Sequence, residues 1–133
     1  MSQENVEVVR AHIEAFGQDA PRALALLDPS VVLDMSRGPS LDTEPAYGRD
    51  GVANAMRRYV GAFENYSFEA ERLTDLGSGA VLAVVTETGS GKSSGVPVRR
   101  SFVILYSVLD GKITRITMFS SEDDALAAVR GPD

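Results

Sequence analysis

The sequence predicts an α+β fold, because a mostly helical first half is followed by a strand-rich second half. Apolar residues recur at helical spacing in residues 2–16, 19–28 and 50–64, which is the pattern of amphipathic helices. From residue 66 onwards the spacing becomes that of strands separated by glycine-rich turns. The predicted order is two helices, a strand, a helix, an antiparallel meander and a closing helix, which is typical of the α+β class.

The first two helices are indicated by their ends as well as by their apolar residues. Ser2 can cap the first helix and Gly17 ends it, while Asp19 can cap the second, which stops at residues 28–29. His12 lies one turn from an apolar residue on either side, at the edge of the first apolar stripe. That stripe consists of Val6, Val9, Ile13 and Phe16.

A short strand at residues 30–34 and a polar loop at residues 36–47 lead into the third helix. This helix runs from about residue 50 to residue 64. Ser121 can cap the closing helix, residues 122–130, whose first-turn aspartates interact favourably with the helix dipole. The apolar stripe of the third helix consists of Val52, Met56, Tyr59, Val60 and Phe63.

The meander contains four predicted strands. Asp110-Gly111 is a strong signal for a two-residue hairpin turn, and residues 77–79 and 89–95 serve as the other turns. The strands themselves are expected at residues 67–74, 80–88, 96–109 and 112–120.

The strand at residues 96–109 is apolar on both faces, so it should be buried on both sides. Helices can cover one face, and the other needs a second partner. We therefore expect a homodimer formed through the sheet. The two faces consist of Phe102, Ile104, Tyr106 and Val108, and of Val103, Leu105 and Leu109.

Residues 86–97, TETGSGKSSGVP, contain Gly91-Lys92-Ser93, which is the end of a phosphate-binding loop motif. The complete motif requires a glycine five positions before Gly91, where Thr86 stands, and a helix after the loop. A strand-like run follows instead. We interpret this segment as a hairpin turn.

Composition excludes several functional classes. The 133 residues form one domain with 44% apolar and 24% charged residues, as in an ordinary globular protein. The absence of cysteine excludes disulfides and thiol chemistry, and a single histidine excludes a multi-histidine metal site. The net charge of −6 argues against nucleic acid as a partner. With no apolar run of about 18 residues and no signal peptide, we expect neither a membrane partner nor export, but a cytoplasmic protein.

Four segments together resemble the SnoaL-like branch of the nuclear-transport-factor-2-like superfamily: VEVVRAHIEAF, VVLD, YGRDGVANAM and SFVILYSVLDGKITRITMFSSEDDALAAV. The resemblance covers nearly the whole chain and implies a single SnoaL-like domain over residues 1–133. It implies a curved antiparallel sheet wrapped around three helices, a cone-shaped, cystatin-like α+β barrel with an internal cavity. Members include ketosteroid isomerases, limonene-type epoxide hydrolases, scytalone dehydratases and polyketide cyclases.

The family's catalytic positions are only partly kept. The base of the ketosteroid isomerases falls on Asp34 and their tyrosine on His12, but their oxyanion-binding acid falls on Ile104, which cannot donate a hydrogen bond. The last-strand aspartate of the epoxide hydrolases falls on Met118, and residues 86–90 lack their arginine. Scytalone dehydratases use two histidines. The polyketide cyclases need mainly one acid or base in an apolar cavity, which this chain can supply.

Three polar residues are candidates for the site that the resemblance implies. Asp34 would be a general base whose pKa is raised by desolvation, or a strand-end aspartate that caps the loop at residues 36–38. His12 would donate a proton or bind an oxyanion, or be a satisfied core residue. Arg100 would anchor an anionic or carbonyl oxygen, neutralise Asp34 or Glu87, or lie in solvent.

The remaining candidates would line the cavity or, alternatively, only fill a core. The hypothesis is a cofactor-independent enzyme of the isomerase, cyclase or lyase type, without a metal, acting on a small apolar or carbonyl-containing molecule. The alternative is a non-catalytic small-molecule-binding or dimerisation module of the same fold. The expected lining consists of Phe16, Met56, Tyr59, Phe63, Phe102, Ile104, Tyr106, Ile116, Met118 and Ser120.

Overall fold

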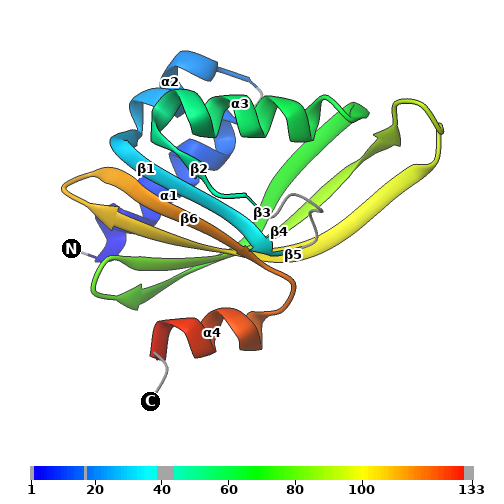
Figure 1. Cartoon of the computed structure of the whole chain (residues 1–133). Coiled ribbons are helices and arrows are strands. Elements are labelled where there is room, and N and C mark those ends of the chain that lie inside the picture. Colours follow the sequence, from blue (N-terminus) through cyan, green and yellow to red (C-terminus); the bar gives the residue numbers. More distant parts are fainter. Residues whose placement is uncertain (1, 17, 39–43, 131–133) are drawn as a thin grey trace.

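A computed structural model describes residues 2–16, 18–38 and 44–130 and shows the predicted α+β architecture (Figure 1). The sheet has six strands in the order β2-β1-β6-β5-β4-β3 and is curved. The helices are α1 (Ser2–Ala15), α2 (Ala20–Ala25), α3 (Gly48–Val60) and α4 (Glu122–Arg130). The strands are β1 (Leu27–Arg37), β2 (Ala46–Tyr47), β3 (Phe63–Gly77), β4 (Ala80–Gly91), β5 (Pro97–Leu109) and β6 (Lys112–Phe119).

Local signals in the sequence are confirmed at several element ends. Asp19 caps α2 by accepting a hydrogen bond from the Arg22 backbone N–H at 3.2 Å, and Ser121 accepts one from the Asp124 N–H at 3.2 Å. Asp110 and Gly111 both have positive φ, as a two-residue hairpin of the expected type requires. Gly17 and the side chain of Ser2 lie outside the described residues.

The sheet is mixed rather than purely antiparallel. Strands β3 to β6 form the expected antiparallel meander, but β1 pairs parallel to β6, with Leu33 opposite Ile116. Parallel partners require a long connection between them, and here α3 and the other strands of the meander supply it. This pairing joins residues far apart in the sequence, so no local pattern indicates it.

The segment between α2 and α3 also differs from the prediction. Residues 27–28 belong to β1 rather than to the preceding helix, and α3 ends at residue 60 rather than 64. Within the predicted loop, Ala46 and Tyr47 form the edge strand β2 against β1. Two residues are too few to show strand periodicity in a sequence. Residues 39–43 of that loop lie outside the described part of the chain.

The turn after β4 is a hairpin and not a phosphate loop. The Gly91 backbone N–H donates to the Val96 carbonyl and the Gly91 carbonyl accepts from the Gly95 N–H, and strand β5 follows directly. The N–H groups that bind phosphate in such loops belong to the N-terminus of a helix, whereas a strand follows this turn.

Two hydrophobic clusters lie on opposite faces of the sheet. Helices α1, α2 and α3 cover one face, and α4 lies on the other (Figure 1). On the α4 side, Leu82, Val103, Phe119 and Ala125 form a small buried cluster. On β5 the face of Phe102, Ile104, Tyr106 and Val108 is buried as predicted. On the other face Val103 is buried, Leu105 is half-buried and Leu109 is exposed, and α4 provides part of the cover that was assigned to a second copy. Homodimer formation stays a prediction.

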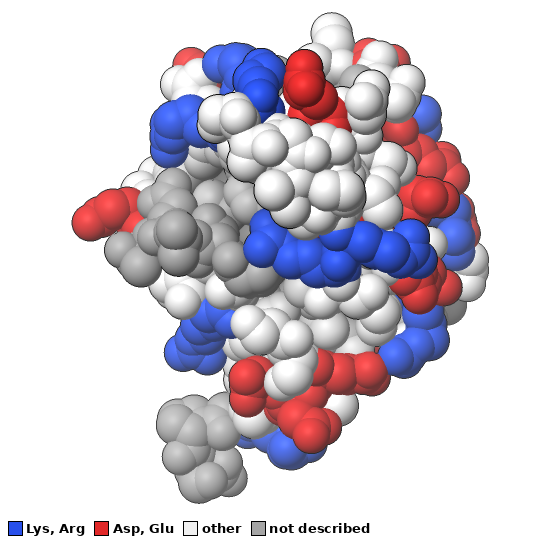
Figure 2. Space-filling view, turned by 90° about the vertical axis from the view of Figure 1, so that its right-hand side faces the viewer, with Lys and Arg blue, Asp and Glu red and all other residues white. Residues whose placement is uncertain are grey.

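The surface carries charges of both signs. On the face shown in Figure 2, Lys and Arg side chains form a band, with acidic side chains gathered to one side and below. None of the described helices is long and apolar enough to cross a membrane.

Two turn glycines allow a test of the close approach between neighbouring hairpins. A Cβ at Gly79 would lie 2.5 Å from the Val108 carbonyl oxygen, whereas a Cβ at Gly111 would meet nothing within 4 Å. Both residues have positive φ, so Gly111→Ala should lose only about 1 kcal/mol of unfolding free energy. Gly79→Ala should lose about 2 kcal/mol more, because the clash adds to the strain. Equal losses in urea unfolding would contradict this contact.

Candidate functional site

An interior cavity lies between the helices and the concave face of the sheet. Its volume is about 30 Å³, which is space for about two water molecules at roughly 10–15 Å³ each. His12 forms part of its wall. Eight residues that the sequence indicated as lining are found there: Phe16, Met56, Tyr59, Phe102, Ile104, Tyr106, Ile116 and Met118.

A second space, here called the helix pocket, lies between α1, α2 and α3. Its volume is about 360 Å³, within the range of small-molecule sites. Most of its wall is apolar, with Arg57 as its charged residue, and His12, Phe16 and Met56 are shared with the interior cavity. The apolar wall includes Ala23, Leu24, Leu27, Val52 and Val60.

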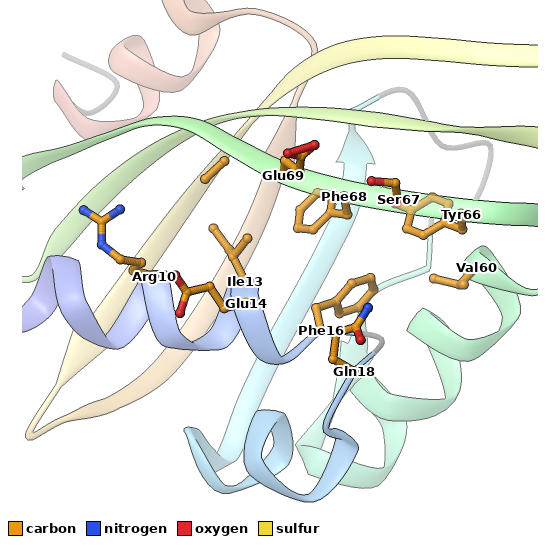
Figure 3. A pocket seen from close by; sticks show the side chains of 11 residues that line it. Arg10, Ile13, Glu14, Phe16, Gln18, Val60, Tyr66, Ser67, Phe68 and Glu69 are labelled. Carbon is orange, nitrogen blue, oxygen red and sulfur yellow. The ribbon is translucent and has the colours of Figure 1, made fainter.

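A third space, here called the edge groove, lies between α1 and the edge strand β3 (Figure 3). Its volume is about 620 Å³. Polar side chains from both elements border it, including Arg10 and Glu14 of α1 and Glu69 of β3. Phe16 and Phe68 form part of its apolar wall.

His12 is the buried polar group between the interior cavity and the helix pocket. The residue is 2% exposed, and its Nδ1 has no hydrogen-bond partner within residues 2–16, 18–38 and 44–130. The ring packs edge-on to Tyr106, with 6.2 Å between centroids. Burial lowers the pKa of His12 to about 4, so the imidazole is neutral near pH 7. A buried group that lacks a partner costs about 1–3 kcal/mol, and a ligand could provide that partner.

A second polar group in the core is the carboxylate of Glu87, which is fully buried. Its Oε1 accepts a hydrogen bond from the Tyr66 hydroxyl at 2.7 Å, and its Oε2 accepts one from the Tyr59 hydroxyl at 2.6 Å. Arg100, opposite Glu87 on the neighbouring strand, donates from Nε to Oε2 at 2.8 Å and from Nη2 to the Tyr59 oxygen at 3.0 Å. These four residues, called the Glu87 cluster, join α3, β3, β4 and β5.

The Glu87 cluster keeps both of its tyrosines neutral. Burial, followed by the hydrogen bond and charge of Glu87, raises the pKa of Tyr59 and of Tyr66. Burying a carboxylate is unfavourable unless it is paired and hydrogen-bonded, and here all three donors contribute. Arg100 therefore has the role of neutralising Glu87, one of the roles expected for it.

Asp34 does not belong to the walls of these three spaces. Its neighbours Leu33 and Met35 line the interior cavity, so strand alternation turns Asp34 to the opposite face. Asp34 Oδ1 accepts hydrogen bonds from the Ser36 N–H and hydroxyl at 2.9 and 2.6 Å. Oδ2 lies 3.4 Å from Arg115 Nη2.

Electrostatics also oppose a role for Asp34 as a base with a raised pKa. The hydrogen bonds from Ser36, with a smaller effect of Arg115, lower the pKa of Asp34 below its ordinary value. The expectation of a desolvated base is therefore wrong, because the carboxylate is hydrogen-bonded and faces away from the cavity. The alternative interpretation, a strand-end aspartate that caps the following residues, agrees with the structure. Consequently His12, Asp34 and Arg100 do not converge.

Two predicted lining residues lie elsewhere. Phe63 packs against Tyr59 and Tyr66, behind the cavity wall. Ser120 is exposed just after β6, and its backbone N–H donates to the Arg37 carbonyl at 3.1 Å.

Sequence reasoning missed several lining residues and the two tyrosine partners of Glu87. Leu33, Met35, Tyr66 and Phe68 all border the interior cavity. A signal for Glu87 was present, because it continues the buried face of Val81, Ala83 and Val85 on β4. Within residues 2–16, 18–38 and 44–130, no group of three or more His, Asp or Glu side chains could hold a metal ion.

A curved sheet whose concave face is covered by three helices over an internal cavity defines the chain as an α+β protein of the nuclear-transport-factor-2-like class. The profile of the SnoaL-like domain matches residues 9–116. The chain therefore belongs to the SnoaL-like family.

Solved structures support the same fold. A nuclear-transport-factor-2-like protein from Burkholderia xenovorans is 22% identical over 100% of this chain and 98% of its own, with a TM-score of 0.73. An LEH-like epoxide hydrolase from M. tuberculosis is 20% identical over 94% of this chain and 84% of its own, with a TM-score of 0.70. A protein with the ketosteroid isomerase-like fold from Catenulispora acidiphila, solved with trimethylamine, is 17% identical over 95% and 94%, with a TM-score of 0.74. These similarities show the fold alone. A search of curated proteins found no match.

Glu87→Gln should test the energetic weight of the Glu87 cluster. The change removes the charge that pairs with Arg100 and should lower the unfolding free energy by about 2–3 kcal/mol, because Arg100 is left without its buried partner. Glu122→Gln is the matched control, since Glu122 pairs with Arg72 on the surface and should lose under about 1 kcal/mol. Denaturant unfolding gives both values, and equal losses would show that the cluster contributes little.

The buried state of His12 predicts a pH dependence of stability. Below about pH 6.5 the unfolded chain binds a proton at His12 that the folded chain takes up only near pH 4. The unfolded state therefore binds more protons in this window, and stability falls as pH falls through it. The total loss is at most roughly 3 kcal/mol.

His12→Gln should flatten this part of the stability profile relative to the wild-type chain. Because His12 is the one histidine of the sequence, NMR titration of its ring protons measures its pKa without ambiguity. A measured pKa near 6.5 would show that the ring is hydrated and would remove this explanation.

Proposed function

We propose that this chain binds a small, mostly apolar carbonyl compound and acts on it as a cofactor-independent enzyme of the isomerase, cyclase or lyase type, with His12 transferring the proton. The observation that carries the proposal is the buried Nδ1 of His12, which has no partner among the described residues. It belongs to a ring in the wall shared by the interior cavity and the apolar helix pocket.

The chemistry follows from the neutral state of the imidazole. A neutral ring has one N–H donor and one nitrogen lone pair, so it can hydrogen-bond a carbonyl oxygen or accept a proton from a carbon next to it. Tyr106 packs against the ring, and burial raises the pKa of its hydroxyl, which therefore stays a neutral group. In such an apolar environment each hydrogen bond to a developing negative charge is stronger than in water.

This proposal changes two roles that the family resemblance implied. Asp34 is replaced as the proton acceptor by His12, since the carboxylate of Asp34 points away from the cavity. Arg100 supports the cavity wall through Glu87 and Tyr59. Membership of a fold family that includes isomerases and epoxide hydrolases supports a chemical role but does not select one reaction.

A second candidate function is non-catalytic binding of the same kind of compound. The coordination of Glu87 favours it, because that carboxylate already accepts three hydrogen bonds and is engaged as a structural group. A dimerisation module stays a prediction, and its contact would involve the part of the outer sheet face around Val84 and Leu105, which are half-buried beside the α4 cluster.

Deuterium exchange of cyclohexanone, a single-ring ketone with acidic α-hydrogens, tests the proposed reaction type. The wild-type chain should accelerate exchange in D₂O, followed by NMR, and His12→Gln should lose about 100-fold of that acceleration. Asp34→Asn serves as the matched control and should keep it.

The outcomes separate the two candidate functions. Exchange that persists in His12→Gln but is lost in Asp34→Asn would overturn the role of His12. Ligand-dependent shifts of the His12 ring signals without accelerated exchange would favour the non-catalytic binder.

A further inference from the structure

We infer that Phe16 sets the size limit of the ligand, because its ring separates the interior cavity from the helix pocket and the edge groove. The inference rests on the proposed function, since it concerns the same site. Phe16 belongs to the walls of all three spaces, and it is the one residue that the three described walls have in common.

The interior cavity is too small for an organic ligand as it stands. At about 30 Å³ it has room for water alone, although His12 and Tyr106 both border it. The helix pocket and the edge groove, at about 360 and 620 Å³, have ligand-sized volumes. A ligand that extends from either of them into the interior cavity must therefore displace part of the wall.

Phe16 is well placed to be the displaced part. It follows the last residue of α1 and is half-buried. Figure 3 shows its ring pointing from the end of α1 towards β3, where it meets Phe68 and Tyr66 edge-on, with 5.3 and 6.4 Å between centroids. Edge-on ring pairs of this kind are individually weak contacts, and the backbone N–H of Phe16 keeps its bonds to the carbonyls of His12 and Ile13 when only the side chain turns.

The ring of Phe16 lies next to His12 because of their spacing along the chain. His12 and Phe16 are four residues apart, so their side chains lie on the same face of α1. Tyr66 and Phe68 border both the edge groove and the interior cavity, while His12 and Met56 border both the helix pocket and the interior cavity. Turning the Phe16 ring away would connect these spaces, so that a ligand in the helix pocket or the edge groove extends into the interior cavity beside His12. The resulting chamber would suit a bicyclic carbonyl compound rather than a single ring.

Binding of two ketones to the wild-type chain and three variants tests this inference. The probes are cyclohexanone and 2-acetylnaphthalene, and binding is followed by shifts of the His12 ring signals in NMR. The proteins are the wild-type chain, Phe16→Ala, Phe16→Leu and the control Phe63→Ala. Phe63 shares with Phe16 the contact to Tyr66 and also packs against Tyr59, but it does not belong to the described walls of the three spaces.

Phe16→Ala should bind 2-acetylnaphthalene at least tenfold more tightly than the wild-type chain, with a smaller gain for cyclohexanone. The affinity of Phe16→Leu for 2-acetylnaphthalene should lie between those of the wild-type chain and Phe16→Ala. If Phe16→Ala does not fold, Phe16→Leu alone tests the size limit. Phe63→Ala should show no gain. Equal gains in Phe63→Ala and Phe16→Ala, or no gain in either Phe16 variant, would overturn the inference.

The two proposals fail in different ways. Cyclohexanone that shifts the His12 signals of the wild-type chain, without any gain in the Phe16 variants, would leave the proposed function standing and overturn the size limit. A gain for 2-acetylnaphthalene in Phe16→Ala, without ketone binding or exchange in the wild-type chain, would support the size limit and overturn the proposed function.

Discussion

The buried carboxylate of Glu87 is the constraint on which the arrangement of the core depends. A carboxylate with no solvent contact must be paired and hydrogen-bonded to be tolerated, and its three donors come from three other elements. Arg100 is provided by strand register, since it lies directly opposite on β5. Tyr66 comes from β3 and Tyr59 from α3, so the length of a tyrosine side chain sets how far α3 stands from the sheet. The cluster thereby limits the width of the interior cavity.

Two buried polar groups of the core, Glu87 and His12, lie in different electrostatic environments. At one end, the charge of Glu87 is neutralised by Arg100 and its oxygens are hydrogen-bonded. On α1, His12 is desolvated and its Nδ1 has no partner within the described part of the chain. A group that is buried but not satisfied lowers the stability of the fold, and it marks a site where a ligand can compensate that loss. The energetic contrast between Glu87 and His12 therefore separates the structural polar group from the candidate functional one.

Most of the fold could be predicted from the sequence because its signals are local. Alternation along β4 and β5 and the Asp110-Gly111 turn indicate the meander without reference to anything distant. The parallel pairing of β1 with β6 could not be predicted in this way, because it joins residues about 80 positions apart. In the site, too, local features could be predicted and contacts between distant segments could not. Helical spacing indicated that His12 borders the core, but the missing partner of its Nδ1 depends on side chains from several elements.

Asp34 shows why position along a strand is a weak guide to chemistry in this family. A shift of one residue exchanges the two faces of a strand, and both neighbours of Asp34, Leu33 and Met35, face the interior cavity. This wall therefore presents apolar side chains where the family resemblance implied a base. At about 20% identity the similar structures share the fold but need not share the polar groups that line it. If proton transfer occurs in this cavity, it must use another wall, and His12 on α1 is the imidazole located there, beside neutral tyrosine hydroxyls.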